Sequence, residues 1–137
     1  MEHPVFPAVR IPHLAEAELP LVHRVKLAQP TAPAIDDIEA AVHEALAGSA
    51  ELAALKPGST VAIGVGSRGV ADLPRLGGAT VTYLKNQGLA PFIVPAMGSH
   101  GGATAEGQAL VLARLGVDEA RSGAPVRATM ETVELGR

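Results

Sequence analysis

The sequence has 137 residues, of which 47% are hydrophobic, only 2% are aromatic and none is cysteine. A net charge of -3 with scattered basic residues argues against a nucleic-acid partner, and the lack of cysteine excludes disulfides and thiolate chemistry. No apolar run reaches the length of a membrane span or follows a basic N-terminus as in a signal peptide. These features are typical of a cytoplasmic globular domain with an aliphatic core.

The first third of the chain predicts an arm, a strand and a helix. Residues 1–20 contain four prolines and no clear periodicity, which favours an extended arm. Residues 21–27 can form a strand. Asp36 or Asp37 then begins a helix with apolar residues at three- and four-residue steps, which ends at Gly48. A short helical segment follows over residues 50–55.

The remaining chain alternates strands and helices. A strand ends in the glycines of VGSRG, and a helix follows with Asp72 as its N-cap, Pro74 in its first turn and a Gly-Gly pair at 77–78 that predicts close packing. Residues 92–97 predict the next strand, Thr104 caps the next helix, Asp118-Glu119 begins another, and residues 125–135 predict one or two further strands. The alternation predicts a single α/β domain with a Rossmann-like parallel or mixed sheet flanked by helices.

Two strand ends share one pattern. VGSRG and MGSHG each follow an apolar strand and place one cationic or titratable side chain, Arg68 or His100, after Gly-Ser. They are separated by about the length of one strand–helix–strand unit, so both lie at the carboxyl edge of a parallel sheet. If the two strands are neighbours, both side chains reach one small ligand, because open α/β sheets bind ligands at that edge.

These residue types suit an anion that carries a hydroxyl group. The glycines let a ligand approach the backbone, the start of the next helix offers N–H donors, and a guanidinium matches a carboxylate or phosphate. A neutral imidazole can accept a proton at neutral pH. The predicted site consists of His100 as acid/base and of Gly66, Ser67, Arg68, Gly98, Ser99 and Gly101 as binding residues. The alternative is purely structural, because such side chains also bond loop carbonyls and serines in turns bond their own backbone.

A dinucleotide site is a further alternative, because residues 64–69, GVGSRG, match the G-x-G-x-x-G pattern. In that motif the helix begins at the glycines, whereas Asp72 and Pro74 favour a later start. The next strand also ends without the acidic residue that binds ribose. Nucleotide binding is therefore the minor interpretation. No side chains stand at metal-ligand spacing, so no metal site is predicted within the chain.

The stretches VAIGVGSRGVADL, FIVPAMGSHGGATAEGQ and GAPVRATMETVELG resemble the amino-terminal domain of the lactate racemase family, racemases and epimerases that depend on a nickel pincer nucleotide. The resemblance extends from about Leu21 onward and is most specific in GSHGGAT. It implies that His100 acts as acid/base on the substrate hydroxyl and that Arg68 binds substrate carboxylate or cofactor phosphate. It also implies that hydride leaves the α-carbon for the cofactor ring and returns to the opposite face.

The resemblance has one departure and one large gap. Val65 stands where the better-known lactate racemases have an aspartate. The family's cofactor-anchoring lysine, nickel-binding histidine and second acid/base histidine belong to a later carboxy-terminal domain, which these 137 residues do not include. We therefore expect this chain to bind no cofactor alone, to be inactive alone, and to act on a 2-hydroxy acid or sugar acid with that domain as partner. An exposed domain interface would favour self-association. A small-anion or nucleotide-binding module without catalysis is the alternative function.

Overall fold

The computed structural model describes residues 12, 21–28, 32–134 and 136, and the chain divides into two compact units, residues 1–33 and 34–137. Residues 21–28 form neither helix nor strand, and the side chains of Leu21 and Val22 are 92% and 90% exposed. The strand predicted over residues 21–27 is therefore wrong. The backbone of this segment finds no hydrogen-bonding partner among the described residues, and a strand needs such a partner. The predicted arm, Pro12 excepted, lies outside the described residues.

The second unit mixes helices and strands around a two-stranded parallel sheet. Strand β1 (Thr60–Val65) pairs with β2 (Ala90–Pro95) in register along their whole length. Beyond β2, the described chain adds a single bridge, Ile93 to Val126. The prediction of one or two full strands over residues 125–135 is therefore wrong, because the described residues after this bridge find no further backbone ladder.

Helices connect and flank the strands. Helix α3 (Leu73–Asn86) carries the chain from β1 to β2, while α4 (Ala105–Arg114) and α5 (Glu119–Ser122) follow β2. Strand β2 ends earlier than predicted, so Met97 lies in the following loop. The core joins residues from β1, β2, α4 and their loops: Val65, Ile93, Met97, Leu112 and Val117. Two of these core residues, Val65 and Met97, directly precede the Gly-Ser pairs of the two loops that carry the predicted site. None of the helices among the described residues is long and apolar enough to cross a membrane.

Local capping explains where several helices begin. Helix α1 (Ile38–Ala47) starts after Asp37, whose carboxylate accepts the Ala40 N–H at 2.9 Å, and it ends at Gly48 as predicted. Helix α2 (Ala50–Ala53) and the capped starts of α4 and α5 also confirm their predictions. Asp72 precedes α3, but its backbone is left-handed and its side chain makes no capping bond. The predicted cap at Asp72 is therefore wrong, although the predicted start of the helix is confirmed.

The glycine pair in α3 does not mark a close approach. A methyl group added at Gly77 or Gly78 would meet no heavy atom within 4 Å outside its immediate surroundings. The prediction of close packing there is therefore wrong, because the neighbouring elements leave room at this part of the helix.

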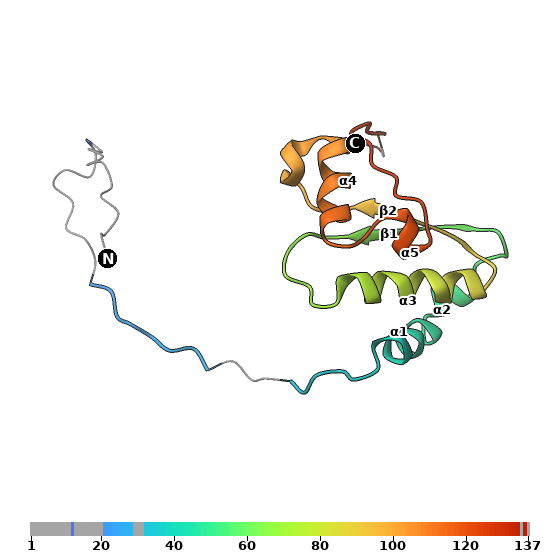
Figure 1. The fold of residues 1–137 in the computed structure, drawn as a ribbon, viewed down its shortest axis with the longest axis horizontal. Helices are drawn as coiled ribbons and strands as arrows, with labels where there is room; N and C mark the ends of the chain where they lie inside the picture. Colours follow the sequence, from blue (N-terminus) through green and yellow to red (C-terminus); the bar gives the residue numbers. More distant parts are fainter. Residues whose placement is uncertain (1–11, 13–20, 29–31, 135, 137) are drawn as a thin grey trace. The chain divides into compact units, whose positions relative to one another are not determined.

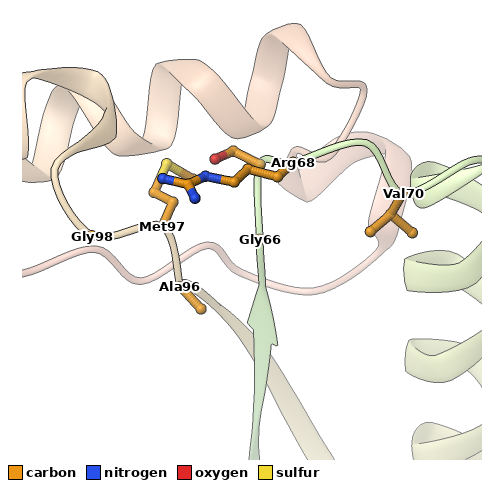
Figure 2. A pocket seen from close by; sticks show the side chains of 7 residues that line it. Gly66, Arg68, Val70, Ala96, Met97 and Gly98 are labelled. Carbon is orange, nitrogen blue, oxygen red and sulfur yellow. The ribbon is translucent and has the colours of Figure 1, made fainter. Parts of the chain in front are cut away.

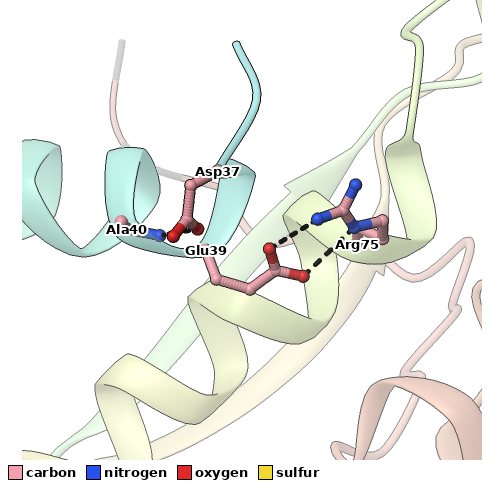
Figure 3. Close-up of polar contacts among 4 residues, drawn as sticks. All are labelled: Asp37, Glu39, Ala40 and Arg75. Carbon is pink, nitrogen blue, oxygen red and sulfur yellow. Dashed lines mark hydrogen bonds and ion pairs between the residues drawn. The ribbon is translucent and has the colours of Figure 1, made fainter.

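Helices α1 and α3 lie against each other and share an ion pair (Figure 1, Figure 3). Arg75 donates from Nε and Nη2 to the two carboxylate oxygens of Glu39, at 3.1 and 2.6 Å. The hydrogen bonds from the Arg75 side chain are the main reason that the pKa of Glu39 lies below its usual value. The same contact raises the pKa of Arg75. Both side chains are about half exposed, so salt weakens the pair.

This ion pair predicts that the contact of α1 with α3 weakens in acid. A carboxyl whose pKa is lowered by folding stabilises the folded form above its unfolded pKa, and this contribution is lost as pH falls through the folded pKa. We expect amide protection in α1 to decline with acid pH before protection in β2 does, measured by hydrogen exchange. Glu39→Gln should remove most of this pH dependence. Glu44→Gln, the same change elsewhere on α1, should leave it in place, and equal effects of the two would contradict the assignment.

Candidate functional site

The two glycine-serine loops meet at the carboxyl ends of β1 and β2. Between them lies a hollow of about 360 Å³, which is at the small end of the range for ligand pockets. Its lining comes from both loops and comprises Gly66, Ser67, Arg68, Val70, Ala96, Met97 and Gly98. Figure 2 shows the Arg68 side chain reaching from the end of β1 toward Met97, with Val70 on the side of α3. The parallel pairing of the strands therefore brings both loops to one place.

His100 contacts two neighbouring residues of the other loop. Its Nδ1 lies 2.5 Å from Ser67 Oγ, and its Nε2 lies 3.5 Å from Arg68 Nη2. Arg68 and His100 are thus adjacent, as expected from the ends of neighbouring parallel strands. His100 is partly buried and does not itself line the hollow; it touches the two side chains that do.

Other predicted site residues divide into two groups. Gly66, Ser67 and Gly98 line the hollow together with Arg68. Ser99 is exposed and is not part of the lining. Gly101 also lies outside the lining, as His100 does.

Gly101 has a different structural reason to lack a side chain. A methyl group there would lie 2.6 Å from the backbone nitrogen of Gln108 and from the carbonyl oxygen of Gly107. Its φ of 65° is also one that side chains disfavour. Gly101 therefore permits the loop to touch the first turn of α4. The sequence instead predicts that this glycine lets a ligand approach the backbone.

The start of α4 is partly capped from within the chain. The Thr104 hydroxyl accepts the Gly107 N–H at 3.1 Å and donates to the Gly101 carbonyl at 3.2 Å. These bonds join the helix to η2 (His100–Ala103), the short turn that carries His100. At least one of the N–H donors that the sequence offered to a ligand is therefore used inside the protein.

Gln108 has a role in the site that the sequence analysis missed. This side chain is 7% exposed, and its Nε2 donates to the carbonyl of Gly98 at 2.7 Å. It thereby ties α4 to the loop that lines the hollow. A glutamine among helix residues gives no local sign of this bond, because its partner lies in the preceding loop.

Gln108→Leu should loosen the loop while leaving α4 helical. The change removes the hydrogen bond to the Gly98 carbonyl, and a typical hydrogen bond of this kind is worth about 0.5–1.5 kcal/mol. Urea denaturation should show this loss, with faster hydrogen exchange in residues 98–103. Gln87→Leu makes the same chemical change at the exposed end of α3 and should shift stability by less than about 0.5 kcal/mol. Similar effects of the two substitutions would contradict a role for Gln108 in holding the loop.

The charge of Arg68 is not neutralised by the rest of the described chain. Arg75 and Arg121 are paired with carboxylates, but no carboxylate of the described residues forms an ion pair with Arg68. Within the described ranges there is also no cluster of three histidine, aspartate or glutamate residues that could hold a metal ion. The site is therefore equipped to bind an anion through the guanidinium.

The geometry also bears on the dinucleotide alternative. Helix α3 begins at Leu73, several residues beyond the glycines of GVGSRG. The dinucleotide-binding motif requires a helix that begins at the glycine loop, and α3 does not begin there.

The comparisons with known proteins are negative throughout: no family model, no curated protein and no solved structure matches this chain.

Proposed function

We propose that this chain contributes the anion-binding and proton-transfer wall of a racemase or epimerase active site. The contact that carries the proposal is the 3.5 Å approach of Arg68 Nη2 to His100 Nε2, at the joined ends of β1 and β2. A guanidinium that binds a carboxylate beside an imidazole that accepts a hydroxyl proton suits a 2-hydroxy acid or sugar acid. The β1–α3–β2 unit also fits the Rossmann-like fold expected from the sequence.

The nickel pincer nucleotide implied by the family resemblance does not fit the described residues as a metal ligand set. They hold no cluster of metal-binding side chains, although Arg68 suits a phosphate. In this proposal another domain holds the cofactor and supplies redox chemistry. The present chain orients the anion and moves the hydroxyl proton. By itself it is inactive.

An exposed apolar side chain supports a partner domain at this edge. Val70, which lines the hollow, is 52% exposed. A covering domain would exclude water from the hollow and bury Val70. A second copy of the chain could cover the same surface in its place, which is the expected self-association.

A binding experiment with the chain alone tests the anion-binding part of the proposed function. Titration with glycolate, followed by amide NMR shifts, should perturb residues 66–70 and 96–98. Arg68→Ala should weaken binding at least about tenfold, because a hydrogen bond to a charged group is worth about 1.5–3 kcal/mol. Arg68→Lys should recover only part of it, since an ammonium lacks the planar fork. Arg114→Ala removes an exposed charge from the end of α4 and should have little effect.

The second candidate is an anion-binding module without chemistry. Both nitrogens of His100 already contact side chains of this chain, which favours a structural role for the ring in that case. Glycolate and acetate then bind equally well, because only the carboxylate is recognised. A clear preference for glycolate supports the proposed function.

A further inference from the structure

The two nitrogens of the His100 ring contact chemically different groups. Both partners come from the loop after β1: Ser67 Oγ lies 2.5 Å from Nδ1, and Arg68 Nη2 lies 3.5 Å from Nε2. A serine hydroxyl can donate or accept a hydrogen bond, whereas a guanidinium can only donate. The two contacts together therefore restrict where the ring proton can lie.

Only one neutral tautomer satisfies both contacts. Since Arg68 cannot accept, the nitrogen that faces it must present its lone pair, and a neutral ring then carries its proton on Nδ1. That Nδ1–H donates to Ser67 Oγ at 2.5 Å. The opposite tautomer would place an N–H of the ring against the N–H groups of Arg68.

We propose that Ser67 is a positioning residue that, together with Arg68, fixes the Nδ1–H tautomer of His100 and makes Nε2 the proton-accepting atom. The inference rests on the proposed function, since it names the atom through which His100 acts. The contact between Arg68 and Nε2 is at the long limit for a hydrogen bond. It is therefore a weak bond, and an anion that draws the guanidinium into the hollow frees Nε2 for the substrate hydroxyl.

Ser67 has this role because of its place in the backbone. It lines the hollow and is partly buried, and it is the second residue after the end of β1 at Val65. The buried Gln108 holds the facing loop through Gly98, close to His100. Both sides of the Ser67–His100 hydrogen bond are thus attached to regular structure, which keeps the ring orientation defined.

Long-range ¹H–¹⁵N NMR of the histidine rings tests the tautomer in the chain itself. At about pH 8.5, two units above the usual histidine pKa, His100 should carry its proton on Nδ1 over Nε2 by roughly tenfold. The exposed His23 gives the solvent reference within the same spectrum, and His100→Gln identifies the His100 signals. Ser67→Ala should shift the His100 pattern toward that of His23, although the weak contact with Arg68 keeps part of the preference, and Ser67→Thr should restore the wild-type pattern.

Two outcomes would overturn the proposal: a wild-type His100 ring protonated on Nε2, or a ratio that Ser67→Ala leaves unchanged. Backbone spectra of the variants verify that each is folded. Neither outcome bears on whether His100 is needed for turnover, which is measured separately with the complete enzyme. Conversely, the expected tautomer with full turnover after loss of His100 would refute the proposed function and leave the tautomer assignment standing.

Discussion

His100→Ala should lower turnover of a 2-hydroxy acid by about two to four powers of ten, the usual contribution of a general acid/base. The measurement requires this chain joined to the cofactor-bearing domain that the proposed function includes. The ring is placed for the role because it touches Arg68 at the joined ends of β1 and β2. Binding of glycolate to the chain should change much less, since Arg68 and the loop backbone remain.

A matched control is available in α1. His43 packs edge-on against Tyr83, with ring centroids 5.4 Å apart, and has no part in the hollow. His43→Ala removes an imidazole of the same kind and should leave turnover near the wild-type value, after correction for any loss of folded protein. Near-normal turnover of His100→Ala would end its assignment as the acid/base.

Gly101→Ala should cause the largest loss of stability among single methyl additions in the site loops. The new methyl group would lie 2.6 Å from backbone atoms of Gly107 and Gln108, which cannot rotate away. Overpacking costs about 1–3 kcal/mol, and the left-handed backbone adds about 1–2 kcal/mol. We therefore expect the free energy of unfolding to fall by about 2–5 kcal/mol, measured by denaturant titration.

Gly102→Ala separates these two causes. Its backbone is also left-handed, with φ 69°, but an added methyl group would meet no heavy atom within 4 Å. This substitution should cost only the backbone strain of about 1–2 kcal/mol. Equal losses in the two variants would show that the contact between Gly101 and α4 does not determine the loop.

Helix starts were well predicted because capping is local. Asp37, Thr104 and Asp118 each accept an N–H from a residue three positions onward, so the sequence within one turn contains the signal. The approach of Arg68 and His100 was predictable for a related reason. Parallel strands joined by one helix place their ends together, whatever the details of packing.

Apart from the missing capping bond at Asp72, the failures depend on contacts between residues that no local pattern joins. The apolar residues over 21–27 and the alternation beyond residue 125 favour strands, but a strand forms only where a partner offers its backbone. The packing of Gly101 on α4 and the bond from Gln108 to Gly98 are tertiary contacts without a local pattern. Glycines near a predicted site therefore divided into those that line the hollow and one that packs against a helix.

A crystal structure of the chain with glycolate would test the joint use of Arg68 and His100. The proposed function predicts the carboxylate against the Arg68 guanidinium, inside the hollow between the loops after β1 and β2. It also predicts the glycolate hydroxyl within about 2.6–3.2 Å of His100 Nε2. Glycolate bound at Arg68 with its hydroxyl turned away from His100, or the two side chains directed into separate regions, would contradict it.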